Sequence, residues 1–336
     1  MKTKEKIFEV KPEEIVDVLK NNFFSLTESF YETQSAFLSS IYKKYGSLET
    51  AIIFNSFIKN INLDIIRQKE KNLNHDISFD NLWTNINTVE INGQKISSIS
   101  LVTGIPKETV RRKMKNLTIK GYLNQNLTSK KYFFNIKTNI KEDFINFSDH
   151  QIILLSKFIN KFSKILNLNL DSKMIENEIK LQFSFYWYHF LNHELQWLKM
   201  WQTKLKDNDL LLIILQTVIP TIHRANKPLA NNLNVNNIFK IIGVVNDDFN
   251  FENSAIGATT VSEVTGIPRA TCIRKLEKLV KLGFLIKSAG TRRFFINQNF
   301  ADRTKNIMTK ENVLATIQNF SNFISIILNS LIYYKK

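Results

Sequence analysis

Residues 102–123 read VTGIPKETVRRKMKNLTIKGYL, and residues 264–285 read VTGIPRATCIRKLEKLVKLGFL. The two stretches match without a gap at an offset of 162 residues, and the match continues to Asn135 and Asn297. Of the 34 aligned positions, 13 are identical. Each stretch combines a Thr-Gly-Ile-Pro sequence, a helical pattern of apolar residues and a second glycine. This pattern predicts a short helix, a tight turn and a longer helix.

The similarity extends beyond these stretches. Upstream the offset shifts to 160 residues, where, for example, Phe30 matches Phe190. Internal repetition over about half the chain indicates two similar units rather than a solenoid. We therefore expect a first repeat at residues 1–168 and a second repeat at residues 169–336.

The basic charge is concentrated in the same two places. The chain has a formal net charge of +16. Residues 96–135, the first basic window, contain eight Lys/Arg and one acid, and residues 258–297, the second basic window, contain eight Lys/Arg and two acids. Together the windows carry +13 of the net charge. Focused positive charge indicates an anionic partner.

The composition predicts a soluble, mainly helical protein. Of the 336 residues, 43% are hydrophobic, and there are only 9 Gly and 5 Pro, as expected for long helices around packed cores. The single cysteine, Cys272, excludes an internal disulfide and favours a reducing cytoplasm. No signal-like N-terminus or run of about 18 apolar residues occurs. The apolar stretch from Phe320 to Tyr334 is interrupted at helical spacing and predicts a buried helix.

Each repeat has the same predicted order of elements. A long aromatic helix, at about Phe23–Lys44 or Leu181–Lys206, precedes an apolar helix capped by Ser47 or by Asp207/Asn208. An Asn-rich stretch, the basic window and a closing helix follow. The closing helices are apolar at Leu155, Phe158, Phe162 and Ile165, and at Val313, Ile317, Phe320, Ile324, Ile327 and Leu331. We expect the long helices to form a central bundle that holds the windows apart.

Within the first window, Ser97/Ser98 are expected to cap a short helix that Gly104 ends in a left-handed conformation. The second helix should bury Val110, Met114 and Leu117 and stop near Gly121. Two β segments, Tyr122–Leu123 and Lys131–Phe134, should then form a hairpin. The second window repeats this design with Val261 and Val264, Gly266, Cys272, Leu276, Leu279, Gly283 and a hairpin over Phe284–Ile296.

This order resembles winged helix-turn-helix domains of the broad MarR and Crp/Fnr type, at about residues 95–136 and 257–298. The resemblance rests on Thr103-Gly104-Ile105-Pro106, Thr109-Val110-Arg111-Arg112 and Gly121-Tyr122-Leu123, and on their counterparts beginning at Thr265, Thr271 and Gly283. It covers about 80 residues. It implies a mainly α fold with small β-wings, a second helix that enters the major groove and a wing that reaches phosphate or the minor groove.

The helical period selects candidate DNA-contacting residues. The faces opposite the apolar residues carry Glu108, Thr109, Arg111, Arg112 and Lys115, and Ala270, Thr271, Ile273, Arg274 and Glu277. Arg112 and Arg274 are candidates for bidentate contacts to guanine, whereas Ala270 and Ile273 suit a thymine methyl group. The candidates for phosphate contacts are Lys107, Lys113, Lys130, Lys131, Arg269, Lys275, Lys278, Arg292 and Arg293.

These features predict sequence-specific binding of double-stranded DNA by a bacterial transcription regulator. One chain would imitate the two-fold dimer that relatives form from two subunits. We expect neither a cofactor nor enzymatic activity. The sequence does not identify an effector. A plasmid-type replication initiator with tandem winged helices is an alternative. A protein-interaction module with an unused groove face is another, although the concentrated basic charge argues against it.

Other residue groups have competing interpretations. His189 and His193 have a spacing that can chelate a metal, but no third ligand is evident, so packing or surface histidines are favoured. Trp187, Tyr188, Trp197 and Trp201 could line an effector pocket, with an aromatic core as the favoured alternative. Cys272 takes the buried place of Val110, which favours an inert thiol over a redox switch. No phosphate-binding loop or catalytic triad order is present, so an enzyme is not expected.

Overall fold

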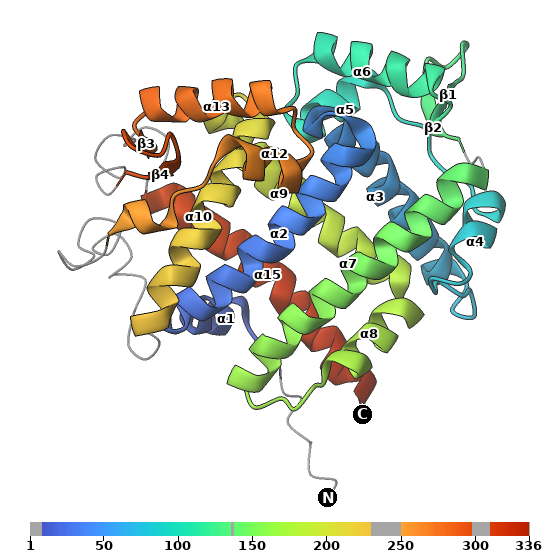
Figure 1. The fold of residues 1–336 in the computed structure, drawn as a ribbon. Helices are drawn as coiled ribbons and strands as arrows, with labels where there is room; N and C mark the ends of the chain where they lie inside the picture. Colours follow the sequence, from blue (N-terminus) through green and yellow to red (C-terminus); the bar gives the residue numbers. More distant parts are fainter. Residues whose placement is uncertain (1–8, 136–137, 230–249, 298–309, 336) are drawn as a thin grey trace, which may run out of the picture.

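The computed structural model describes residues 9–135, 138–229, 250–297 and 310–335. The fold is mainly helical, with two small antiparallel sheets of two strands each (Figure 1). Both basic windows lie entirely within the described residues.

The first half of the chain contains α1 (Pro12–Asn21), α2 (Phe23–Tyr45), α3 (Leu48–Lys71), α4 (Leu82–Thr88), α5 (Ile96–Thr103), α6 (Lys107–Ile119), β1 (Leu123–Gln125), β2 (Tyr132–Phe134) and α7 (Thr138–Ile165). The second half contains α8 (Ser172–Leu181), α9 (Phe183–Leu205), α10 (Asn208–Leu229), η1 (Phe251–Ser254), α12 (Ala258–Thr265), α13 (Arg269–Lys281), β3 (Leu285–Lys287), β4 (Phe294–Ile296) and α15 (Lys310–Lys335). Apart from α4 and η1, the described elements follow the same order in both halves.

The long aromatic helices lie where the sequence predicts them, as α2 and α9. Ser47 caps α3, because its hydroxyl accepts a hydrogen bond from the Thr50 amide at 3.2 Å, which satisfies one free N–H of the first turn. The short helices α1 and α8, which precede α2 and α9, were not predicted from the sequence. Each is ten residues long and turns two residues fully into the core, for example Ile15 and Leu19 of α1.

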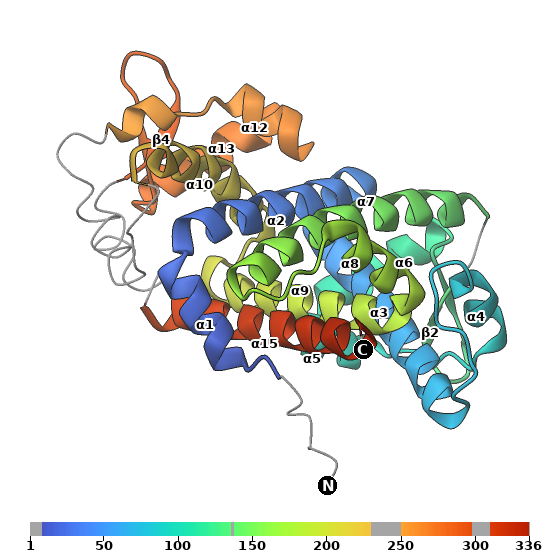
Figure 2. The same ribbon diagram turned by 90° about the horizontal axis from the view of Figure 1, so that it is seen from below.

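The two halves of the chain exchange helices. The most extensive packing joins α3 to α9, α10 to α2, α7 to α8 and α1 to α15, and each of these pairs combines one helix from each half. Figures 1 and 2 show α2 passing over to α10 and α12, while α15 runs back beside α1. The described residues of the two halves therefore share one hydrophobic core and do not form separate globular bodies.

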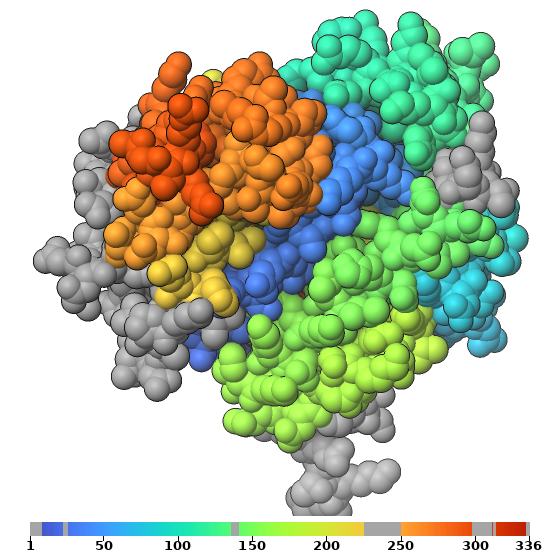
Figure 3. Space-filling view, viewed as in Figure 1, coloured from blue at the N-terminus to red at the C-terminus, as the bar shows by residue number. Residues whose placement is uncertain are grey.

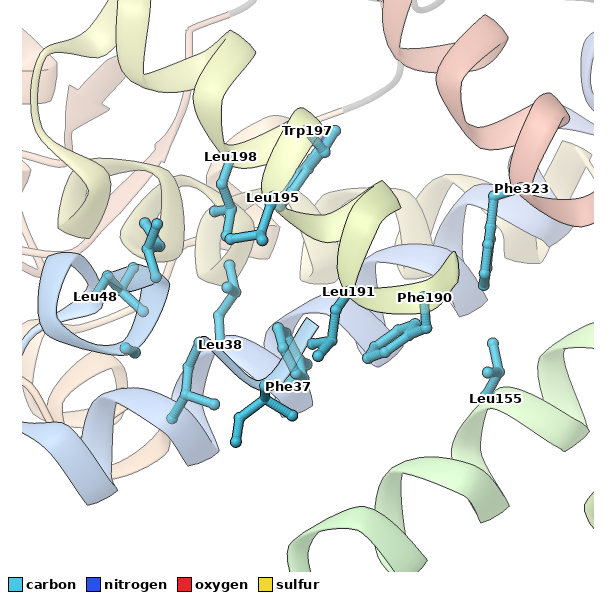
Figure 4. Close-up of a cluster of buried hydrophobic side chains, with 14 of the residues drawn as sticks. Phe37, Leu38, Leu48, Leu155, Phe190, Leu191, Leu195, Trp197, Leu198 and Phe323 are labelled. Carbon is cyan, nitrogen blue, oxygen red and sulfur yellow. The ribbon is translucent and has the colours of Figure 1, made fainter. Parts of the chain in front are cut away.

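Equivalent residues meet reciprocally where α2 and α9 cross. Phe37 contacts Phe190 with ring centroids 5.2 Å apart, and Phe30 contacts Trp197 at 6.1 Å. These pairs exchange places under the offset of 160 residues. Figure 4 shows Phe37 directed toward Phe190 and Leu191 of α9. Two pairs of residues that match under the offset therefore contact each other reciprocally.

The closing helices α7 and α15 bury most of the apolar positions expected of them. In α7, Leu155, Phe158 and Phe162 are buried, but Ile165 at the end of the helix is 36% exposed, which corrects the expectation for that residue. In α15 the predicted positions Ile317, Phe320, Ile324, Ile327 and Leu331 are all buried. The side chain of Val313 lies outside the described part of the structure.

Candidate nucleic-acid interface

The turn between the first two helices of each window is built identically. Gly104 and Gly266 end α5 and α12 in the left-handed region, with φ of +73° and +76°, where glycine avoids the steric cost of a Cβ. In each turn the preceding threonine hydroxyl donates back to its own helix, Thr103 to the Ile99 carbonyl and Thr265 to the Val261 carbonyl. The Thr-Gly-Ile-Pro sequence thus forms the same tight turn twice.

One expected cap is wrong. The helix α5 begins at Ile96, and its N-cap is Lys95, which makes no side-chain capping hydrogen bond. Ser97 and Ser98 therefore lie in the first turn of the helix and are exposed. Their exposure adds two hydroxyl groups to the surface of the first window.

The second helices α6 and α13 have the faces that the helical period predicts. In α6, Val110, Met114 and Leu117 are at most 1% exposed, and in α13 the equivalent Cys272, Leu276 and Leu279 are fully buried. The exposed candidates are Lys107, Glu108, Arg111, Arg112, Lys115, Lys130, Arg269, Ala270, Arg274, Lys278, Arg292 and Arg293, and the half-buried ones are Thr109, Lys131, Thr271, Ile273 and Glu277. Each window therefore presents a largely polar, exposed helix face.

Arg112 and Arg274 are the equivalent residues on these faces. Within the described chain, neither has an ion pair or a hydrogen-bonding partner. Their neighbours do have partners, because Arg111 pairs with Glu108 at 3.4 Å and Glu277 pairs with Lys287 of the hairpin at 3.1 Å. Both guanidinium groups are consequently available for a planar, bidentate acceptor.

Lys113 and Lys275 do not belong to the exposed face, which corrects the phosphate role expected of them. The Lys113 ammonium donates to Ser47 Oγ at 2.8 Å and lies 3.6 Å from Glu49. Lys275 is 8% exposed and bonds both carboxylate oxygens of Asp207 at 2.7 and 2.8 Å. The two lysines connect α6 and α13 to the starts of α3 and α10 through hydrogen bonds and ion pairs. These tertiary contacts could not be predicted from the sequence.

The hairpins carry basic residues at a strained position. In each hairpin the returning strand pairs both with the outgoing strand and with a residue before the window's first helix, Tyr132 with Gln94 and Phe294 with Ile256. At the tips, Lys130 and Arg292 have φ of +53° and +55°. Left-handed backbone is costly for a residue with a Cβ, yet both windows place a cation there.

A recess opens in the second window between the start of α12, the start of α13 and the hairpin. Its basic lining residues are Arg269, Lys287, Arg292 and Arg293, together with the hydroxyls of Thr259, Thr260 and Thr291, and no acidic residue lines it. Arg269 Nε donates to Thr259 Oγ1 at 3.0 Å. The half-buried Ile273 also lines the recess. The recess suits an anionic oxygen group.

Both windows lie along one edge of the molecule. In Figure 1, α6 and α13 run along the upper edge, and Figure 3 shows residues of α2 and α3 between the two windows. Each window is held by a helix from the other half, since Lys199 of α9 donates to the Leu101 carbonyl at 2.8 Å. Lys43 of α2 correspondingly packs against Gly266. The contacts of Lys199 and Lys43 with the windows were not predicted from the sequence, because each joins a helix of one half to the window of the other half.

The two histidines of α9 and the single cysteine are packed against other side chains of the fold. His193 stacks on Phe323 and bonds Asn319, and burial lowers its pKa to about 4. His189 packs against Phe185 at 4.7 Å. No group of three or more potential metal ligands occurs among the described residues. Burial raises the pKa of the Cys272 thiol.

The four aromatic candidates on α9 separate into two environments. Trp187 lies in the core at 1% exposure, and Tyr188 packs against His189 at 5.1 Å. Trp197 and Trp201, in contrast, line a cavity. Of the four residues, only Trp197 and Trp201 line a cavity, which was the less favoured alternative, and Trp187 is a core residue as favoured.

Comparison with known proteins adds no relative: the chain matches no protein-family model, and no curated protein is significantly similar to it. Within the described ranges, no helix has both the length and the apolar character needed to cross a bilayer.

Proposed function

We propose that this protein binds double-stranded DNA sequence-specifically and acts as a transcription regulator, with the two basic windows as winged helix-turn-helix readers. The observation that carries the proposal is a pair of equivalent arginines, Arg112 and Arg274, which have no partner among the described residues and lie on exposed second helices along one edge of the molecule. A helix on an exposed edge can enter the major groove. Arginine is the side chain best suited to the O6/N7 edge of guanine.

The hairpins and the recess support contacts to the DNA backbone. Lys130, Arg292 and Arg293 stand exposed at the hairpin tips, where the wing of a winged helix contacts phosphate. The acid-free recess between α12, α13 and the second hairpin has the donors that a phosphate oxygen requires. These contacts would set the register of each second helix on the duplex without reading bases.

We further propose that the chain is a pseudo-dimer that arose by internal duplication. The matching order of elements, the reciprocal pairs Phe37–Phe190 and Phe30–Trp197, and the exchange of helices all support this origin. Two readers on one shared hydrophobic core would bind two half-sites of one operator. The half-sites should lie about 10 base pairs, or a multiple, apart in successive major grooves.

Selection from random duplex DNA, followed by light scattering on the complex, tests this model. We expect one chain per operator and an imperfect palindrome, because the helix faces differ at Glu108/Ala270, Arg111/Ile273 and Lys115/Glu277. A perfect palindrome or two chains per operator would contradict the pseudo-dimer. Failure to enrich any sequence, combined with no affinity for random duplex, would instead favour a protein-interaction module.

A symmetrised variant extends this test. In it Ala270, Ile273 and Glu277 become Glu, Arg and Lys, so that α13 copies the α6 face. Lys287 should be changed to Gln at the same time, because Glu277 pairs with Lys287 at 3.1 Å and the first window has Gln125 at that place. The preferred operator is expected to shift toward a symmetric site.

Removing the cations of the first wing should weaken binding to all sequences alike. In the variant Lys130→Ser/Lys131→Ser, we expect the slope of log K against log salt to fall by up to about two, since each lost phosphate contact releases about one counterion fewer. Fluorescence anisotropy over a salt series measures this slope. Lys157→Ser/Lys161→Ser removes two exposed cations of α7 as a matched control, and equal slopes in both variants would exclude the wing from the interface.

A further inference from the structure

The connection between α2 and α3, residues 43–50, contacts both basic windows. The stem of Lys43 lies over the turn of the second window, where a Cβ on Gly266 would fall 2.5 Å from Lys43 Cγ. Four residues later, Ser47 Oγ accepts a hydrogen bond at 2.8 Å from the Lys113 ammonium of the first window. Figure 3 shows residues of α2 and α3 exposed between the two windows. This connection therefore reaches from one window to the other.

The connection between α9 and α10, residues 199–209, makes the reciprocal contacts. Lys199 donates to the Leu101 carbonyl of the first window at 2.8 Å. Asp207 accepts hydrogen bonds from Lys275 of the second window at 2.7 and 2.8 Å. The two connections belong to one surface, because α2 packs against α10 along much of its length. We call the two connections together the central surface.

The central surface is basic. It contains five lysines and three acids, and each acid is paired with a lysine of a window. Lys44 pairs with Asp143 of α7 at 3.5 Å, outside the central surface, and Lys204 is its counterpart in the other half. Lys43 and Lys206 are exposed and make no hydrogen bond or ion pair with any described residue. These two cations indicate an anionic partner.

Lys43 and Lys206 are also the positions at which the two connections differ. Lys206 ends α9 in the left-handed region with φ of +54°, whereas its counterpart Gly46 ends α2 with φ of +72°. This conformation is costly for a residue with a Cβ, and a lysine occurs there nonetheless. Lys43 has the neutral Thr203 as its counterpart. Each connection thus carries one exposed lysine where the other half has a neutral residue.

The proposed binding mode brings DNA to the central surface. A duplex that places two successive major grooves on α6 and α13 turns the minor groove between them toward the protein surface between the windows. The phosphates of both strands border that groove, with about one negative charge for each 1.7 Å along the helix axis. The lysine ammonium is a compact charge on a flexible stem, and such a group suits phosphates whose position varies with the sequence of the spacer.

We propose that Lys43 and Lys206 contact the phosphates of the spacer between the two half-sites, so that the central surface is a third DNA contact beside the two readers. This inference rests on the proposed function. Contacts to phosphate position the duplex without reading bases. The two lysines therefore raise the affinity for every spacer sequence and leave the preference for each half-site unchanged.

Neutral methylphosphonate linkages in the spacer test the proposal with the full chain and the selected operator. The control duplex carries the same number of neutral linkages outside the half-sites. We expect the native chain to bind the spacer-substituted duplex more weakly than the control duplex, by about fivefold for each lost contact at about 0.15 M salt, since each contact releases about one counterion.

The variant Lys43→Thr/Lys206→Gly gives each position the residue of its counterpart. We expect its slope of log K against log salt to fall by up to about two, with an unchanged half-site profile. It should also bind the spacer-substituted and control duplexes equally. The variant Lys43→Arg/Lys206→Arg keeps the charges and should distinguish the two duplexes as the native chain does.

The matched control is Lys157→Gln/Lys161→Gln, which removes two exposed cations of α7 and should keep the full difference between the duplexes. Equal binding of both duplexes by the native chain would overturn the proposal while specific binding of the operator, and with it the proposed function, remained. A difference that persists in Lys43→Thr/Lys206→Gly would also overturn it. If the native chain binds no duplex specifically, the proposed function fails and this inference fails with it.

Discussion

Replacing both Arg112 and Arg274 by alanine is expected to remove about 2–6 kcal/mol of specific DNA binding, a loss between about 30-fold and about 10⁴-fold. Each arginine should contribute about 1–3 kcal/mol through a bidentate contact to one guanine. The two contributions should be nearly additive, because the residues lie in different windows without shared partners. Titration of the selected operator and of a scrambled duplex at one salt concentration measures the loss.

The variant Arg112→Lys/Arg274→Lys is the matched control. Lysine keeps the charge but lacks the planar fork of the guanidinium group. We therefore expect this variant to lose specificity while the salt dependence of its binding stays close to that of the native protein. If the alanine variant has the same specificity profile as the native protein, neither arginine reads bases. The candidate interface would then be wrong.

A second large effect is expected from a carboxylic acid buried where α2 and α9 cross. Glu194 is 1% exposed, and its Oε1 accepts a hydrogen bond from Gln34 Nε2 at 2.5 Å. Gln34 and Glu194 are equivalent residues of the two repeats, 160 positions apart. Burial raises the pKa of Glu194 to about 8, although the Gln34 hydrogen bond opposes the shift.

This raised pKa makes the stability depend on pH. The unfolded chain releases the Glu194 proton near pH 4.5, whereas the folded chain retains it up to about pH 8. The contribution of Glu194 is therefore fully present below pH 4.5 and is lost as the pH rises through 8. With ~1.36 kcal/mol for each unit of pKa, the loss is roughly 5 kcal/mol.

His193 changes the stability with pH in the opposite direction. Because its pKa is lowered to about 4, the folded chain keeps this imidazole neutral, and stability is lost as the pH falls from 6.5 toward 4. The two slopes offset each other between about pH 4.5 and 6.5. The decline in stability caused by Glu194 should consequently appear between pH 6.5 and 8.

Glu194→Gln should remove that decline. We expect urea denaturation to give nearly equal unfolding free energies for the variant and the native chain at pH 4, and a variant that is more stable by several kcal/mol at pH 8.5. Glu263→Gln, at an exposed position of α12, is the control. A difference between Glu194→Gln and the native chain that does not change with pH would show that Glu194 titrates normally in the fold.

Local features of the windows could be predicted from the sequence because short-range chemistry determines them. Gly104 and Gly266 end their helices in the left-handed backbone conformation, which glycine adopts readily. The helical spacing of Val110, Met114 and Leu117 identifies the buried face of the second helix. Glycine geometry and helical periodicity act over a few residues. The same is true of the hairpins, whose strands lie within one or two residues of their expected bounds.

Features that depend on contacts between the halves could not be predicted. Lys113 and Lys275 look like exposed cations in the sequence, and only the tertiary fold brings Glu49 and Asp207 beside them. The pairing of Gln34 with Glu194 joins residues 160 positions apart. Periodicity identifies which face of a helix is buried, but it does not identify the helix that covers it.

The exchange of helices also has a consequence for synthesis of the chain. When residue 168 leaves the ribosome, α3 still lacks α9, α2 still lacks α10, and α1 still lacks α15. At about 5–20 residues per second, the second half takes roughly 10–30 s to follow. During this interval the apolar faces of the first half have no final partner, so the nascent chain is exposed to aggregation and chaperone binding. Folding of the shared core can be completed only after α15 has been made.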